Sequence, residues 1–167
     1  DGRRLIEAAR NAGVEIVVGY TWHYNEQVLT ARRWIAEGRI GSITYVQSFF
    51  GSSPVNLYRG EPEADVYAYG AGAGFDGPLK STYSDPRLAG GGQGQTQLTH
   101  SIALLLFMTG LDAVRVAAFM DTGAAAIDVV DALTIRFRDG ALGVVGSTGA
   151  VVPVTHTDTL GYIIHGS

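Results

Sequence analysis

The strongest constraint on the fold is an alternating stretch of sequence that turns back on itself at Asp139-Gly140. Residues 129–138 alternate between apolar and polar side chains, and residues 141–147 form a short return run of small and apolar side chains. Alternation with a period of two predicts a strand with one buried face, and an Asp-Gly pair between two such runs is typical of a tight hairpin. We therefore expect an antiparallel sheet with one face packed on helices.

Other segments are compatible with the same sheet. Short apolar or alternating runs predict strands at 42–50, 114–120 and 162–165. Asn25 can cap a following helix, and a second helix is expected from about residue 93 to residue 109, where Gly110 stops it. The predicted fold class is α+β, with an open, mostly antiparallel sheet packed against helices.

The first twenty residues have a different pattern. Residues 1–13 place apolar side chains on a helical stripe that ends at Gly13, and residues 14–18 form a nearly continuous apolar run. Such a run is typical of a strand buried on both faces of a parallel sheet. Because a buried strand needs neighbours, we expect the sequence to be a fragment of a longer protein.

Charge and composition exclude several classes of function. The sequence has 12 basic and 16 acidic residues, a net charge of −4, and no cysteine. This argues against nucleic acid and anionic membranes as partners, and it excludes disulfides, thiol catalysis and Cys-ligated metals. The longest apolar stretch, residues 102–108, is far shorter than the roughly 20 residues of a membrane span. We expect a soluble protein, cytoplasmic by default.

Two patterns associated with cofactors and metals are weak here. Residues 72–77 match G-x-G-x-x-G, but Pro78 follows, and no strand and helix flank the turn as a dinucleotide site requires. A flexible loop is the better interpretation. The four histidines show no paired metal-ligand spacing, and His156 with Asp158 alone is a poor site, so we expect no metal. Asp128, Asp131 and Asp139 are interpreted as strand-end and turn acids.

His100 is the main candidate for chemistry. Helical spacing places Thr96, Gln97, His100 and Ser101 on one side of the predicted helix, where its polar end is expected to meet water or a ligand. A histidine near a helix N-terminus is biased toward the neutral imidazole, which can accept a proton near neutral pH. The alternative is a surface histidine bonded to the long loop, and the residues alone do not decide between the two.

An aromatic cluster precedes the capped helix. Trp22, His23 and Tyr24 lie in the segment YTWHYN, directly after the predicted strand at 14–18. The carboxyl end of a parallel strand usually faces a ligand crevice, so these rings are candidates for a substrate pocket. A hinge packed with aromatic residues explains the same pattern equally well.

Several segments in this order resemble the Gfo/Idh/MocA oxidoreductases, which include glucose–fructose oxidoreductase and inositol dehydrogenase. The resemblance covers nearly the whole sequence and rests on five segments taken together. These are AARNAGV at 8–14, VGYTWHYN at 18–25, IAEGRIGSI at 35–43, GGG through TH to TG at 90–110, and DVVDALTIRFRDGALG at 128–143.

The resemblance implies a nicotinamide-dependent dehydrogenase of sugars, polyols or cyclitols. Residues 1–20 would be the last helix and strand of a Rossmann cofactor domain, and residues 21–167 a substrate and dimerisation domain truncated at its C-terminus. NAD or NADP would be bound mainly by the preceding domain, with no cofactor expected in this chain, which alone should be inactive. The open sheet would form a homodimer or tetramer.

By position, His100 matches the family's catalytic histidine, and Trp22, His23, Tyr24, Thr96 and Gln97 are the expected substrate-binding residues. Thr96 stands where the family usually has Asp, and Leu98 where it has a small residue. His23 replaces a frequent Arg, and Lys80 matches no family motif. The departure at Thr96 leaves a second possibility, a non-catalytic ligand-binding or dimerisation module of the same fold.

Overall fold

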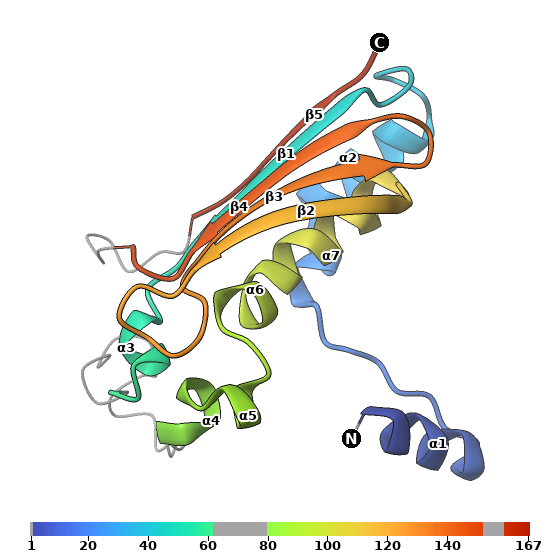
Figure 1. The fold of residues 1–167 in the computed structure, drawn as a ribbon. Coiled ribbons are helices and arrows are strands. Elements are labelled where there is room, and N and C mark those ends of the chain that lie inside the picture. The colour runs from blue at the N-terminus through green and yellow to red at the C-terminus, as the bar shows by residue number, and fades with distance from the viewer. Residues whose placement is uncertain (1, 62–79, 152–158) are drawn as a thin grey trace.

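A single five-stranded sheet forms the centre of the molecule, with helices on one of its faces (Figure 1). The computed structural model describes residues 2–61, 80–151 and 159–167. The strands are β1 (Tyr45–Gly51), β2 (Ala113–Asp121), β3 (Val130–Phe137), β4 (Leu142–Thr148) and β5 (Thr159–His165). Their order across the sheet is β2-β3-β4-β1-β5.

The sheet is mixed but mostly antiparallel. β3 pairs antiparallel with β2 and with β4, and β1 pairs antiparallel with β5. The exception is β1, which lies parallel to β4 with Val46 opposite Gly143. The predicted fold class and the hairpin at Asp139-Gly140 are confirmed, and the expected strand at 42–50 begins three residues later, at Tyr45.

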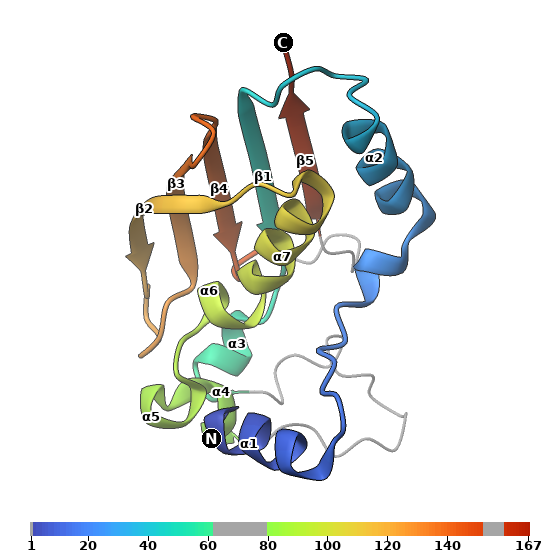
Figure 2. The ribbon, with the colours of Figure 1, turned by 90° about the vertical axis from the view of Figure 1, so that its right-hand side faces the viewer.

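The alternation of β3 and β4 produces the predicted buried face. Helix α7 (Leu98–Thr109) packs across β1 and β4 on that face, as Figure 2 shows. The main core joins the helix to three strands through side chains that are 5% exposed or less. It comprises Val46, Leu98, Leu105, Ile135, Phe137, Ala141 and Val145.

The predicted helix over 93–109 is interrupted, which corrects the expectation of one continuous helix. α6 (Gln93–Thr96) and α7 meet at Gln97, whose φ and ψ are −115° and −47°. The N-terminal turn is held by Asp128, whose backbone carbonyl accepts from Gln93 N at 2.9 Å. α7 packs instead on β1 and β4, so the chain changes direction at Gln97. Gly110, with φ of 68°, ends α7 as expected.

Two further helices form where the sequence predicts them. α1 (Gly2–Ala12) ends at Gly13, which has φ of 66°. α2 (Glu26–Ala36) is capped by Asn25, whose side-chain oxygen accepts from Gln27 N at 2.9 Å. A short 3₁₀ turn, η1 (Thr21–Tyr24), connects the extended segment to α2.

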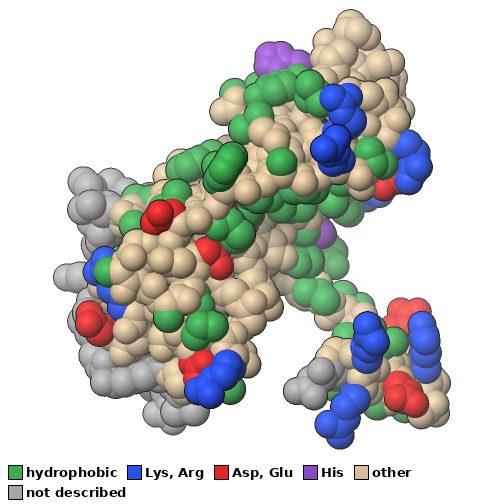
Figure 3. Space-filling model, viewed as in Figure 1, with side chains coloured by type: hydrophobic (Ala, Val, Ile, Leu, Met, Phe, Trp, Pro, Cys, Tyr) green, Lys and Arg blue, Asp and Glu red, His purple; other side chains and the backbone are tan. Residues whose placement is uncertain are grey.

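The strand expected at 14–18, which depends on neighbouring strands, is not formed in this structure and stays a prediction. Residues 14–20 form no regular element, and Val14, Ile16, Val17 and Val18 are 55–74% exposed. A strand exists only through bonds to a neighbouring strand, and the described residues provide none here. Figure 3 shows the charged side chains of α1 standing apart from the rest of the molecule.

The segment between β1 and α6 is partly helical. It contains α3 (Val55–Tyr58), α4 (Lys80–Ser84) and α5 (Pro86–Ala89), with Asp85 capping α5. The G-x-G-x-x-G match at 72–77 lies outside the described residues, as do His156 and Asp158.

Candidate active site around His100

His100 lies in the first turn of α7, partly buried between the helix and the segment before α2. Burial lowers the pKa of its imidazole below the ordinary value. The direction agrees with the sequence-based expectation of a neutral ring, although the cause is burial rather than the helix end. Within the described residues the imidazole nitrogens make no hydrogen bond.

Two aromatic rings flank the imidazole. Tyr20 meets His100 edge to face, with ring centroids 5.4 Å apart and an interplanar angle of 87°. The indole of Trp22 is tilted against His100 at 5.5 Å and reaches Phe50 of β1 at 5.6 Å. Both rings that contact His100 thus come from a segment about 80 residues earlier in the sequence.

Tyr20 also connects this segment to the helix. Its hydroxyl lies 2.8 Å from the Thr99 hydroxyl, and its ring stacks with His23 at 5.4 Å. By sequence this aromatic cluster is a candidate pocket wall or hinge, and Tyr20 is not among the residues expected to bind substrate. The signal that pointed to Tyr20 was its place at the start of the aromatic segment.

His23 packs into the interface between α2, η1 and α7. Its ring stacks on Phe107 at 4.4 Å with the planes 5° apart, and Arg32 of α2 lies 4.2 Å from the same phenyl ring. The His23 Nε2 atom is buried without a hydrogen-bond partner in the described part of the chain. Tyr24, by contrast, is 74% exposed.

Thr96 belongs to a buried polar network rather than to an open polar surface. Its hydroxyl donates to the Gly92 carbonyl at 2.8 Å and lies 2.5 Å from the Tyr58 hydroxyl. Tyr58 also donates to Gln93 Oε1 at 2.9 Å. Gln93 is fully buried, and its amide nitrogen donates to Ser147 at 2.7 Å.

The expectation that this polar end meets water or a ligand is therefore wrong for Gln93 and Ser101. Ser101 is fully buried and bonded to the Ser48 hydroxyl. Both polar side chains find partners on β1, β4 or α3, and local helical spacing does not reveal such long-range partners. Gln97, at the break between α6 and α7, is partly buried.

A buried acid lies beside the α6 turn. The Asp128 carboxylate accepts from Gly92 N at 2.8 Å and from Gly94 N at 2.7 Å. Asp131 is only 2% exposed, and both of its carboxylate oxygens lack a hydrogen-bond partner among the described residues. Burial, together with the nearby charge of Asp128, raises the pKa of Asp131 to about 7.

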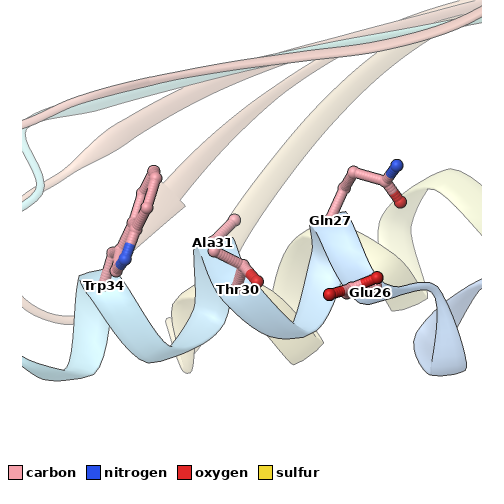
Figure 4. A pocket seen from close by; sticks show the side chains of 5 residues that line it. All are labelled: Glu26, Gln27, Thr30, Ala31 and Trp34. Carbon is pink, nitrogen blue, oxygen red and sulfur yellow. The ribbon is translucent and has the colours of Figure 1, made fainter.

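A shallow pocket on α2 is separate from these groups. It is lined by Glu26, Gln27, Thr30, Ala31 and Trp34, whose side chains are drawn in Figure 4. None of the sequence-predicted site residues lines it. Within the described ranges, no three or more His, Asp or Glu residues are grouped to hold a metal ion.

The family comparison is decisive for classification. Residues 28–167 match the family described as the GFO/IDH/MocA C-terminal domain. The chain belongs to this family. The resemblance recognised in the sequence is thereby confirmed.

Solved structures show the same fold. GenD2 from gentamicin A biosynthesis, in complex with NAD, is 22% identical and has a TM-score of 0.72, covering 99% of this chain and 41% of that chain. Levoglucosan dehydrogenase in complex with NADH and L-sorbose is 19% identical with a TM-score of 0.73, covering 99% and 41%. A putative myo-inositol dehydrogenase from Sinorhizobium meliloti 1021 is 14% identical with a TM-score of 0.67, covering 98% and 43%.

These matches locate the GFO/IDH/MocA domain within larger proteins. The chain spans about two fifths of the length of the structures it matches. A comparison with curated proteins found no match. Among the described residues, no helix combines the length and apolar character needed to cross a bilayer.

Proposed function

We propose that this chain is the substrate-binding and oligomerisation part of an NAD(P)-dependent oxidoreductase acting on a hydroxyl group of a sugar, polyol or cyclitol. The observation that carries the proposal is the partly buried His100, whose pKa is lowered by burial and whose ring is flanked by Tyr20 and Trp22. A neutral imidazole can accept the proton of a hydroxyl group. Family membership supports this, as do structural relatives named with NADH and L-sorbose.

The chemistry assigned to this chain is the proton half of an alcohol oxidation. The substrate hydroxyl gives its proton to an imidazole nitrogen of His100. The carbon that bears this hydroxyl loses a hydride and becomes a carbonyl carbon. A nicotinamide cofactor, when bound, accepts that hydride. Trp22, His23, Tyr24, Thr96 and Gln97 are the proposed substrate-side wall.

The described residues do not provide a dinucleotide site of their own. None of their strands enters a G-x-G-x-x-G turn that opens a helix, which is the arrangement that cradles a pyrophosphate. We therefore place NAD or NADP mainly on another part of the protein, with residues 1–20 assigned to that part. The exposed apolar side chains at 14–18 are consistent with such a neighbour.

Replacing His100 tests the assignment. His100→Ala in the intact protein should lower turnover by roughly 10²–10⁴ in assays of sugars and polyols with NAD and NADP, because a general base is removed. His165→Ala, at the exposed end of β5, is the matched control and should retain activity. Unchanged turnover in His100→Ala would contradict the assignment.

One observation favours a second candidate, a non-catalytic ligand-binding module. Thr96, four residues before His100, is uncharged, and its hydroxyl is engaged by Gly92 and Tyr58, so it does not supply the charge that a carboxylate would bring near the imidazole. Calorimetry with a sugar panel separates the two. Tight binding by the intact protein without cofactor reduction would favour the module.

The outer face of the sheet is the proposed oligomer surface. Its exposed apolar side chains come from all five strands: Phe49, Phe119, Val130, Leu142, Val144 and Ile163. Hydrophobic side chains are also visible along the sheet in Figure 3. Since a large exposed apolar face is unusual for a monomer, we propose a homodimer or tetramer formed through this face.

A further inference from the structure

The orientation of the His100 ring raises a specific question. Ordinarily a catalytic imidazole is oriented by a hydrogen bond to its second nitrogen. The described residues give His100 no such bond, and the Thr96 hydroxyl is committed to Gly92 and Tyr58. What confines the imidazole is the pair of rings from Tyr20 and Trp22.

These two rings depend on a weakly anchored segment. The preceding residues 14–18 are largely exposed, and the backbone hydrogen bonds that they make with other described residues are local, such as Val14 N to the Ala9 carbonyl. Among the described residues, ring contacts connect this segment to the rest of the fold, namely His23 on Phe107 and Trp22 on Phe50. A hydrogen bond between the Tyr20 and Thr99 hydroxyls, at 2.8 Å, adds a polar anchor.

The Tyr20 anchor is the one that acts directly on His100. Thr99 is the residue adjacent to His100 on α7, so the bond ties the Tyr20 ring to the same helical turn that carries the imidazole. With the hydroxyl bonded, the edge-to-face contact at 5.4 Å is maintained. Water is then kept from that side of the imidazole, which disfavours its charged form.

We propose that Tyr20 is a positioning residue that holds the His100 imidazole in place through its hydrogen bond to Thr99. It acts by ring packing where a carboxylate would otherwise orient the histidine. The catalytic consequence rests on the proposed function, whereas the effect on the imidazole does not.

The test is an NMR titration of the histidine side chains in the whole chain, with the His100 signal assigned by its loss in His100→Gln. Tyr20→Phe removes only the hydroxyl, so the ring loosens, water reaches the imidazole, and the pKa of His100 rises toward the ordinary value of about 6.5. Thr99→Val removes the other partner and should give the same rise. The double variant should show no further rise, because both changes break one bond.

Tyr45→Phe is the matched control. Tyr45 also lies beside a histidine, His165, with ring centroids 6.0 Å apart, but it is on β1 and makes no contact with His100. This variant should leave the pKa of His100 unchanged. Equal pKa values for His100 in the wild type, Tyr20→Phe and Thr99→Val would overturn the proposal, as would an equal shift in Tyr45→Phe.

Kinetics add a second readout in the intact protein. Tyr20→Phe should reduce kcat about tenfold with little change in KM, and the acid limb of the pH–rate profile should move with the pKa of His100. An absence of oxidoreductase activity would refute the proposed function alone. The titration would still decide the role of Tyr20.

Discussion

Asp131 shows how a single buried side chain couples this fold to pH. It lies on the helix-covered face of β3, opposite Met120 of β2 and Ser147 of β4. The charged group next to it is Asp128, and α6 contributes only uncharged side chains. With a pKa raised to about 7, Asp131 holds its proton in the folded state over a range where the unfolded chain has released it.

The sign of the pH dependence follows from that difference. Between about pH 4 and about pH 7 the folded state binds more protons, so the free energy of unfolding falls as pH rises and levels off above about pH 7. Asp131→Asn, a neutral mimic of the protonated acid, should remove this dependence and be more stable than the wild type at pH 8, by as much as about 4 kcal/mol.

Urea unfolding at pH 5 and pH 8 measures the effect. Asp139→Asn is the control, because Asp139 lies in the exposed β3–β4 turn and an amide oxygen can still accept from Ala141 N. A wild type equally stable at both pH values would show that Asp131 ionises normally.

Among the elements, the turn before α6 depends on a close backbone approach. A Cβ added at Gly92 would lie 2.0 Å from the Asp128 carbonyl oxygen, a backbone atom that cannot move aside as a flexible side chain can. Gly92→Ala should therefore destabilise the protein by roughly 2–4 kcal/mol and disturb the Thr96 network. Thermal or urea unfolding would show this loss.

Gly161 provides the comparison at the same scale. It lies in β5, and a Cβ there would have open space around it. Gly161→Ala should change stability by well under 1 kcal/mol in either direction. A Gly92→Ala variant as stable as Gly161→Ala, within about 1 kcal/mol of the wild type, would mean that the Gly92 turn adapts to a side chain.

For the whole molecule, the outer sheet face governs the predicted assembly. Val144 lies near the centre of the sheet on β4 and is 40% exposed. If copies associate through this face, Val144→Lys should place a charge in the interface and shift the protein toward the monomer. Sedimentation velocity over a range of concentrations measures the shift.

Leu88→Lys serves as the control for this substitution. Leu88 is 66% exposed but belongs to α5, away from the sheet. A protein that is monomeric at every concentration before substitution would contradict the proposed oligomer, and an equal effect of both variants would place the interface elsewhere.

The sequence by itself determined the local features of this protein. Asn25 capping α2, Gly13 and Gly110 ending α1 and α7, and the Asp139-Gly140 hairpin were all predictable, because each depends on residues within a few positions. The alternation of β3 likewise predicted which face is covered. His100 could be singled out from its place on the helix and from the family resemblance.

Only the tertiary structure decided which distant residues meet. It placed Tyr20 and Trp22 on His100, buried Gln93 and Asp131, and left residues 14–18 without a strand partner. It also set β1 parallel to β4. Strand pairing, desolvation and ring contacts depend on which segments come together across the fold, and a local pattern of side chains does not contain that information.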